Sequence, residues 1–387
     1  MAQIPILYDE DTLLHHSLEL IGHKLIDAHE SPDRILRIFA AMEHSTSFIN
    51  LVKIQCSEDS VMSQISLSNV HSKEYIEHLK TIFDRFLSAG AVEESGCILP
   101  ECFPHHSLLH TKPQAPHDKI GSSSAETSAQ LKSFRLPKDP FSHLGYYSFD
   151  LSSGMSKDTF KSALAAVNLA LKGVDLLLEG SHPVAFALTR PPGHHSCRSL
   201  AGGYCYFNNA AIAADYLLEK LGPFSGPDRG QSRVVILDLD FHHGNGTQSL
   251  TYDKREPAYI SIHGEDEYPY YTGAADEKGI GEGEGYNCNL PLAARPNSTR
   301  DDYLSALNSA IDIIQTKWRP AYLLVSIGFD TFRKDPLGAF ELDVDDYKRI
   351  GMYIRSLHVP ILLLLEGGYS DELGDLVIKL LEGLQSE

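Results

Sequence analysis

Short apolar runs alternate with longer helical patterns along the chain from about residue 156 onward. Five runs have the length of a strand and are almost continuously apolar: PVAFAL (183–188), VVILDLD (234–240), AYISIH (258–263), AYLLVSI (321–327) and PILLLLE (360–366). Continuous apolar runs are typical of strands that are covered on both faces, as in a parallel sheet. We therefore predict that all five are buried parallel strands.

The stretches between and after these runs have the boundaries expected of helices. They cover the residues 157–179, 209–221, 301–317, 345–357 and 372–384. Glycine stops and acidic starts mark their ends. Strands that alternate with helices predict an α/β fold with a mostly parallel central sheet, flanked by helices, that binds ligands at the carboxyl ends of its strands. We expect a single domain over 1–387 with a long loop insertion at about 91–150, in which 113–139 is polar.

Composition and charge narrow the class of protein without identifying it. The 387 residues are 42% hydrophobic and 9% aromatic, which is ordinary for a globular chain. The formal net charge of −19 argues against nucleic acid as a direct ligand and slightly favours cationic substrates. The six cysteines form no CxxC pair and are typical of reduced thiols, and no segment resembles a secretion signal or a membrane span. These features predict a cytoplasmic or nuclear protein without a membrane partner.

The densest group of reactive residue types follows the second apolar run, in LDLDFHHGNGTQ. Asp238, Asp240 and His242 alternate along extended chain, where alternate residues point the same way. Asp240 and His242 can therefore meet at one ion, with Asp330 at the end of LLVSIGFD as the third ligand. Two carboxylates and an imidazole suit one zinc ion, and three protein ligands leave room for water and substrate. Such residues at a strand end often only cap turns, but this pattern favours a metal site.

Two further strand ends carry groups that could transfer protons or donate hydrogen bonds. TRPPGHHS places His194 and His195 in a loop that proline and glycine stiffen, and Asp238 and Asn245 are the expected partners of their rings. LLEGGYS presents Tyr369 after two glycines, where its phenol could donate to an oxyanion as it forms. Each signal alone is weak, but all of them belong to the same edge of the predicted sheet.

Together these groups predict metal-assisted hydrolysis of a carbonyl compound. The sequence contains no GxSxG motif that would place a nucleophilic serine on a strand-to-helix turn. Cys205 follows Gly203 and Tyr204 without the histidine or charge that would mark a nucleophilic thiolate. The predicted mechanism therefore needs no covalent intermediate.

Motifs along nearly the whole chain resemble those of the histone deacetylase superfamily. Three of them are spread from the N-terminal region to the last strand: HESPDR (29–34), VHSKEY (70–75) and LLEGGY (364–369). Three more are similar to its class II-like branch: RPPGHH (190–195), GGYCYFNNAAIAA (202–214) and DFHHGNGTQ (240–248). Two are most similar to the acetylpolyamine amidohydrolases: YPYYTGAADEKGIGEGEG (268–285) and FDTFRKDP (329–336). The resemblance implies an arginase/deacetylase-like fold and a zinc-dependent amidohydrolase that removes acetyl groups from amines.

The resemblance gives the same metal ligands as the residue patterns and assigns proton transfer to the two histidines and carbonyl polarisation to the tyrosine. His195 is expected to be the principal base and acid, with His194 as its electrostatic partner. The resemblance adds a narrow tunnel for an aliphatic chain, with Gly203, Tyr204 and Tyr271 in its wall. It also adds a structural potassium ion held partly through backbone oxygens, by Asp238, Asp240, His242, Ser261 and Ile262.

The chain departs from the family pattern at positions that affect the histidine pair and the choice of substrate. Asn245 stands where class I enzymes have aspartate, so His195 lacks a full negative charge behind it. One eukaryotic type of polyamine deacetylase has glutamate where this chain has Leu337. In the bacterial polyamine enzymes an acidic residue of the long loop has the equivalent role, and the candidates in the comparable region are Glu93, Glu94 and Glu101.

Four functions remain open at this point. The favoured one is a deacetylase for acetylated polyamines or similar small amines, which the resemblance implies is a homodimer formed through the long loop. The second has the same chemistry on acetyl-lysine in proteins. The third is a zinc-stabilised binding protein without catalysis, and the fourth is a ureohydrolase with two manganese ions, which would need more aspartate ligands than the one triad supplies.

Overall fold

The computed structural model describes residues 3–43, 48–58, 65–103, 138–224 and 231–386. The predicted polar loop at 113–139 therefore lies outside the described residues, apart from its last two. Among the described residues, no helix has the length and apolar character needed to cross a membrane.

A single sheet of eight strands forms the centre of the molecule. Its order is β4-β1-β5-β10-β9-β6-β7-β8, and every neighbouring pair is parallel. The strands are β1 (Ile4–Tyr8), β4 (Ile49–Lys53), β5 (Val184–Ala187), β6 (Val234–Asp238), β7 (Ala258–Gly264), β8 (Asn287–Leu292), β9 (Tyr322–Ile327) and β10 (Ile361–Leu365). The five predicted strands are confirmed, and the structure adds β1, β4 and β8. A separate antiparallel hairpin joins β2 (Leu18–Ile21) to β3 (Lys24–Asp27).

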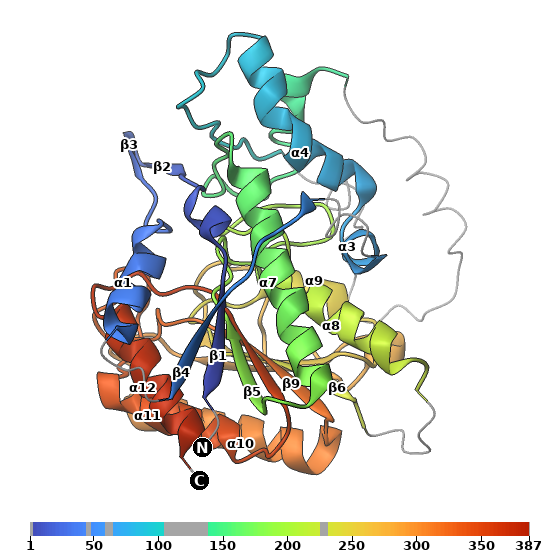
Figure 1. Cartoon of the computed structure of the whole chain (residues 1–387), viewed down its shortest axis with the longest axis vertical. Coiled ribbons are helices and arrows are strands. Elements are labelled where there is room, and N and C mark those ends of the chain that lie inside the picture. The colour runs from blue at the N-terminus through green and yellow to red at the C-terminus, as the bar shows by residue number, and fades with distance from the viewer. Residues whose placement is uncertain (1–2, 44–47, 59–64, 104–137, 225–230, 387) are drawn as a thin grey trace, which may run out of the picture.

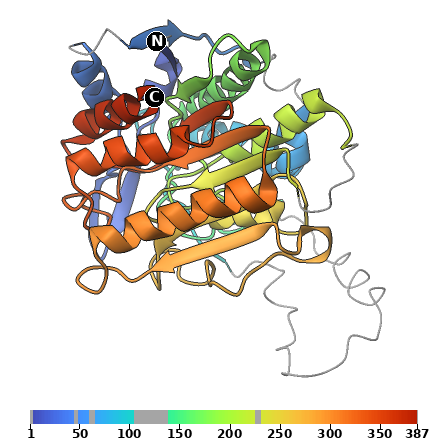
Figure 2. The ribbon, with the colours of Figure 1, turned by 90° about the horizontal axis from the view of Figure 1, so that it is seen from below.

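Helices cover both faces of the sheet (Figures 1 and 2). One face packs against α1 (Asp33–Met42), α10 (Arg300–Ile313), α11 (Val344–Arg355) and α12 (Leu373–Gln385). The other packs against α3 (Ile65–Val70), α4 (Lys73–Ser88), α7 (Thr159–Glu179), α8 (Asn209–Leu221) and α9 (Asn245–Thr251). Short turns of helix complete the chain: η1 (Glu10–Leu13), η2 (Pro140–His143), η3 (Gly281–Gly283) and η4 (Ile314–Trp318).

The last strand shows why these runs are apolar without interruption. Leu362 and Leu364 belong to the core on the α7 side, whereas Ile361, Leu363 and Leu365 belong to the core on the α12 side. All five are fully buried. Because successive side chains of a strand point to opposite faces, a strand covered by helices on both faces needs an apolar residue at every position.

The sheet order brings the predicted motifs together. Strands β5, β10, β9 and β6 are four consecutive neighbours in the middle of the sheet, although they come from widely separated parts of the chain. All four run in the same direction, so their carboxyl ends meet at one edge. The two histidines follow β5, the tyrosine follows β10, and the three candidate ligands follow β6 and β9.

Candidate active site

Three candidate metal ligands converge directly beyond β6 and β9. One ligand atom from each of Asp240, His242 and Asp330 lies within 4.8 Å of the other two. His242 Nδ1 lies 3.2 Å from Asp240 Oδ1 and 3.1 Å from Asp330 Oδ2. Both carboxylates are fully buried, and backbone N–H groups hold their other oxygens, from Gly367 to Asp240 Oδ2 and from Phe241 to Asp330 Oδ1.

The spacing of these atoms fits a zinc ion. Tetrahedral ligands with metal bonds of about 2.0 Å stand roughly 3.3 Å from one another, close to the separations between the imidazole and the two carboxylates. Burial lowers the pKa of His242, but the two carboxylates outweigh it and raise the pKa to about 10 in the metal-free protein. A proton on the imidazole therefore balances the two carboxylates when no cation does so.

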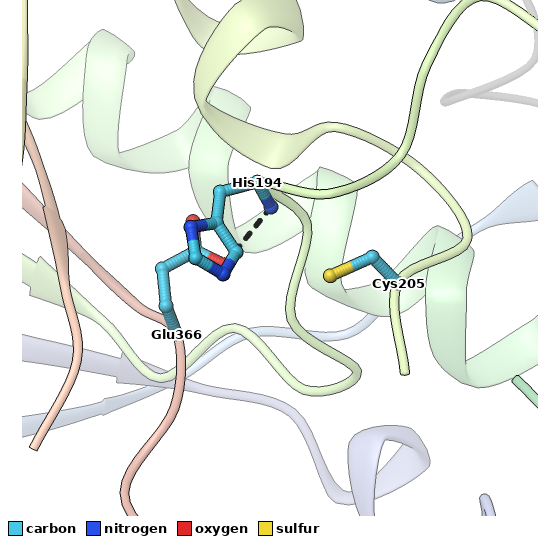
Figure 3. A group of neighbouring side chains, drawn as sticks. All are labelled: His194, Cys205 and Glu366. Atoms are coloured by element: carbon cyan, nitrogen blue, oxygen red, sulfur yellow. Dashed lines mark hydrogen bonds between the residues drawn. The ribbon is translucent and has the colours of Figure 1, made fainter. Parts of the chain in front are cut away.

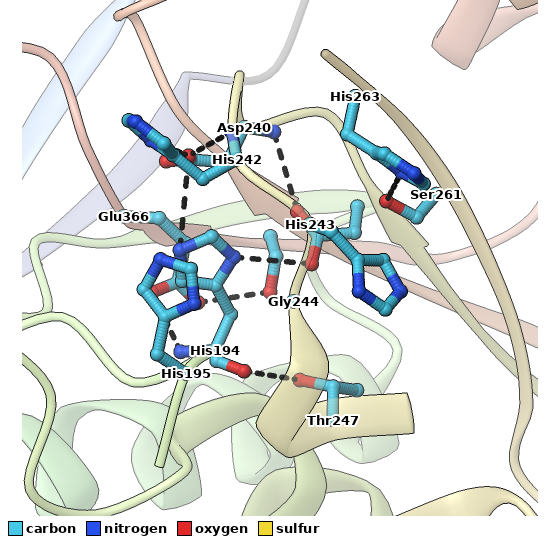
Figure 4. A network of polar contacts seen from close by, with 12 residues as sticks. His194, His195, Asp240, His242, His243, Gly244, Thr247, Ser261, His263 and Glu366 are labelled. Carbon is cyan, nitrogen blue, oxygen red and sulfur yellow. Dashed lines mark hydrogen bonds and ion pairs between the residues drawn. The ribbon is translucent and has the colours of Figure 1, made fainter. Parts of the chain in front are cut away.

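The two adjacent histidines lie beside Asp240 and His242 (Figure 4), and their rings have different partners. Their ring centres are 4.0 Å apart. His194 Nδ1 lies 3.2 Å from Asp238 Oδ2, which also accepts a hydrogen bond from the Tyr259 phenol. His195 Nδ1 lies 2.8 Å from Asn245 Oδ1. The predicted partners of both rings are thus in contact with them, one charged and one neutral.

This difference separates the two imidazoles electrostatically. Burial lowers the pKa of His194, but Asp240 and Asp238 outweigh it and raise the pKa to about 10 in the metal-free protein. Burial lowers the pKa of His195 well below its usual value, and the neighbouring His194 lowers it further. The surroundings of the pair therefore favour a proton on His194 and a neutral ring at His195.

A buried glutamate that the sequence analysis did not single out supports the histidine loop. Glu366 Oε2 accepts hydrogen bonds from the N–H groups of Gly193 and His194, and its Oε1 accepts one from the Ser326 hydroxyl. Figure 3 shows Glu366 together with His194 and Cys205, whose donor atoms also lie within 4.8 Å of one another. Burial raises the pKa of the Cys205 thiol well above its usual value, so it stays protonated. This group therefore holds the loop and does not resemble a second metal centre.

A cavity of about 300 Å³ opens onto the ligands and the two histidines. Its lining is Asp150, Ser152, Pro192, His194, His195, Gly203, Tyr204, Asp240, His242, Glu267, Tyr268, Tyr270, Leu337, Gly367 and Tyr369. Tyr369 is held in place by its backbone N–H, which donates to Asp335, and by the Arg34 guanidinium, 4.8 Å from the centre of its ring. Burial raises the pKa of its phenol well above the usual value, so it is available as a donor.

The tunnel wall differs in one residue from the expectation. Gly203 and Tyr204 line the cavity, but Tyr268 occupies the wall position expected for Tyr271, with its ring centre 4.9 Å from that of His195. Tyr271 is 63% exposed and does not line the cavity, because its loop turns it outward and its hydroxyl accepts from Asn245. The loop contains three tyrosines, of which Tyr268 and Tyr270 line the cavity, and a role of Tyr271 in substrate binding stays a prediction.

Gly203 is required where it stands. Its φ of 55° lies in the left-handed region, and the His195 ring occupies the space that a Cβ would need. Its N–H donates to Asp150 Oδ2, 2.9 Å away, and the Tyr268 phenol donates to the same oxygen at 2.7 Å. Asp150 therefore joins two walls of the cavity. No pattern in the sequence points to Asp150, because it lies within the predicted loop insertion.

The residues expected to hold potassium lie beside one another at the ends of β6 and β7. Asp238 and Ser261 are register partners. Asp238 Oδ1 accepts from the N–H of Asp240, whereas the Ser261 hydroxyl is paired with His263 Nδ1 at 2.8 Å. A potassium site here stays a prediction, as it does for the backbone oxygens of His242 and Ile262.

The acidic loop residues proposed for substrate binding lie elsewhere. Glu93, Glu94 and Glu101 are exposed, and none of them lines the cavity. Glu94 instead forms an ion pair with Lys157 at 3.3 Å. Apart from a metal ligand, the acidic residues in the cavity wall are Asp150 and Glu267.

The fold and the site define a class of protein: a parallel α/β enzyme with a candidate metal-ligand triad, two oriented histidines and a phenol at the carboxyl edge of its sheet. The sequence matches the family described as "Histone deacetylase domain" over residues 28–383. The chain therefore belongs to this family and is a hydrolase of the deacetylase type.

The proteins similar to this chain include several acetylpolyamine amidohydrolases. Acetylpolyamine amidohydrolase 2 of Pseudomonas aeruginosa is 37% identical to the chain, over 98% of each sequence. The acetylpolyamine amidohydrolase of Mycoplana ramosa is 33% identical, over 98% of this chain and 99% of its own. The crystal structure of acetylpolyamine aminohydrolase from Burkholderia pseudomallei has a TM-score of 0.79 and 27% identity, over 98% of both chains.

Proposed function

We propose that this protein is a zinc-dependent amidohydrolase that removes acetyl groups from acetylated polyamines or similar small amines. The observation that carries the proposal is the convergence of Asp240, His242 and Asp330 beside two oriented histidines in one cavity. The near full-length similarity to acetylpolyamine amidohydrolases supports the choice of substrate class.

The triad suits a single catalytic zinc. When bound, the ion would polarise the acetyl carbonyl and lower the pKa of nearby water. A ureohydrolase with two manganese ions would need further aspartates at the site. Among the described residues, the other group with metal-binding spacing consists of a histidine, a cysteine and a glutamate, which does not favour that alternative.

The proton-transfer roles follow from the partners of the two imidazoles. Asn245 Oδ1 can only accept, so His195 Nδ1 carries the proton and Nε2 has a free lone pair. His195 Nε2 takes a proton from the attacking water and returns it to the departing amine. His194, held by Asp238, stabilises the negative charge that develops beside it. The Tyr369 phenol donates a hydrogen bond to the oxyanion, which it binds more tightly than the planar amide.

The assignment of the histidines can be tested by alanine variants of each. We expect His195→Ala to lose nearly all turnover and His194→Ala to lose less. If His195→Ala kept near-normal turnover while His194→Ala lost it, the two roles would be reversed.

The substrate class is tested by turnover of zinc-loaded protein on acetylated putrescine and spermidine beside an acetyl-lysine peptide at equal concentration. We expect faster turnover of the polyamines, its loss on chelation and its recovery with zinc. Preference for the peptide would assign the protein to the acetyl-lysine deacetylases instead. If a panel of acyl amides gave no zinc-dependent turnover, and Tyr369→Phe changed nothing, the enzymatic proposal would fail.

Self-association belongs to the same proposal. Large apolar side chains are exposed on the described parts of the loop insertion and just beyond them, at Phe103, Phe141 and Leu151. Their exposure supports a homodimer formed through this region. Light scattering on the purified protein should give twice the mass of one chain, and a monomer would contradict this. A cytoplasmic location stays a prediction.

A further inference from the structure

One carboxylate in the cavity wall differs from the others in having no partner among the described residues. Asp150 accepts hydrogen bonds from Gly203 and Tyr268, and Asp240 is bound by the Gly367 N–H. Within the part of the chain that the structure describes, the Glu267 carboxylate has neither a hydrogen bond nor an ion pair. A partly buried charge without a partner is costly unless a ligand supplies the opposite charge.

Glu267 is placed on the cavity wall by local packing. It follows β7, whose last residue is Gly264. The Glu267 Cγ would lie 2.9 Å from a Cβ at residue 264, with the Phe241 ring at 2.8 Å from the same point. The bare glycine therefore lets the Glu267 side chain fold over the end of the strand, against the residue that precedes the ligand His242. This packing keeps the carboxylate at the cavity.

Its acidic neighbours are placed differently. Glu267 lines both the active-site cavity and an adjoining outer hollow of about 290 Å³. Glu265 and Asp266 are exposed and line only the outer hollow. Three consecutive acidic positions thus include one residue on the path of the substrate and two outside it.

We propose that Glu267 selects cationic amines by pairing with a free ammonium group of the substrate whose amide lies at the metal triad. The inference rests on the proposed function and extends it, because it names the residue that recognises the amine chain. Tyr204, Tyr268 and Tyr270 supply aromatic walls for the methylenes that separate the amide from the ammonium. An aromatic wall also tolerates a cation in transit, and the net charge of −19 draws it toward the protein.

The experiment compares two substrates of the same shape. N-acetylputrescine ends in an ammonium group, and N-pentylacetamide has a methyl group in its place. The ratio of kcat/KM for the two substrates, compared between wild type and variant, measures what the Glu267 carboxylate contributes to recognition of the ammonium group. In Glu267→Gln, which keeps the size of the side chain, we expect this ratio to fall about five- to tenfold, mainly through KM for acetylputrescine. The matched control Glu265→Gln should keep the wild-type ratio.

Salt separates an electrostatic role from a structural one. The difference in ratio between wild type and Glu267→Gln should shrink as the salt concentration rises toward 1 M, because ions screen the pair. A ratio unchanged in Glu267→Gln, with both substrates slowed equally, would overturn the inference and leave the proposed function intact. A wild-type enzyme that hydrolysed neither substrate nor any other acetylated amine would overturn the proposed function, and this inference with it.

Discussion

The floor and the rim of the cavity differ in how deeply their side chains are buried and in how many polar contacts hold them. We use floor for Asp240, His242, Asp330, His194 and His195. We use rim for Glu267 and Tyr270 in the cavity wall and for Tyr271, which lines the adjoining outer hollow. The floor carboxylates are fully buried, His194 and His195 are each 3% exposed, and every floor side chain has a polar partner. At the rim, by contrast, Tyr270 is 74% exposed and Tyr271 63%.

This difference follows from where each region lies in the fold. The floor stands on four neighbouring parallel strands, so its geometry is fixed by the core. The rim belongs to the loop after β7, which closes over the cavity from one side. Changes to the floor should therefore remove the chemistry, whereas changes to the rim should alter the choice of substrate and leave the fold intact.

The largest effect is expected at the metal ligands. Asp330→Asn removes one charge from the triad and should lower kcat/KM by more than about 10³-fold, since a metal centre contributes several kcal/mol to transition-state stabilisation. Zinc content measured after dialysis should fall with it. Asp345→Asn is the matched control, because the Asp345 side chain is 92% exposed and does not belong to the triad. Full zinc content and activity in Asp330→Asn would refute the triad.

The next effect separates chemistry from binding within the same cavity. Tyr369→Phe keeps the ring beside Arg34 and removes only the hydroxyl. We expect kcat to fall by about 10²- to 10³-fold, with little change in KM or in zinc content. A loss confined to KM would instead place the phenol in ground-state binding.

Acid should lower the free energy of unfolding through a buried histidine beside the start of α8. His71 is fully buried, and its Nε2 accepts the Asn208 N–H at the start of α8, so burial lowers its pKa to about 3. The unfolded chain takes up a proton at this site near pH 6.5 and the folded chain does not. The free energy of unfolding should therefore fall as the pH falls below 6.5, by up to about 1.4 kcal/mol per pH unit for this group. The free energy of unfolding, measured with urea between pH 6.5 and 5, should depend less steeply on pH in His71→Gln. The difference in slope should correspond to about one proton.

The smallest effect is expected at the rim. Tyr270 has a φ of 74°, in the left-handed region, and is mostly exposed. Tyr270→Gly removes the backbone strain of that conformation but gives the unfolded chain more conformational freedom. Because these two effects oppose each other, the free energy of unfolding should change by less than about 1 kcal/mol. KM for acetylated amines should change only a few-fold. A large loss of stability in thermal unfolding would show that the rim is part of the core.

The sequence predicts the floor of the cavity and the centre of the sheet better than the rim and the sheet edges. The five central strands were predicted because their runs are almost continuously apolar. Strands β4 and β8, at the two edges of the sheet, were missed because exposed or half-exposed side chains interrupt their pattern. The floor could be anticipated, since its residues follow apolar runs that end at one edge. Asp150 and Glu267 could not, because only the folded loops bring them to the cavity. Glu366 ends one of the predicted apolar runs, but its hydrogen bonds to the histidine loop depend on the pairing of β10 with β5.

The position of β10 has a consequence for synthesis of the protein. It is the last strand along the chain, yet it lies between β5 and β9 in the middle of the sheet. Until residues 361–365 have left the ribosome, no strand connects β5 to β9. We expect nascent chains that stop before this point to expose two unpaired strand edges and to need chaperones. Completion of the sheet and assembly of the active site should therefore coincide.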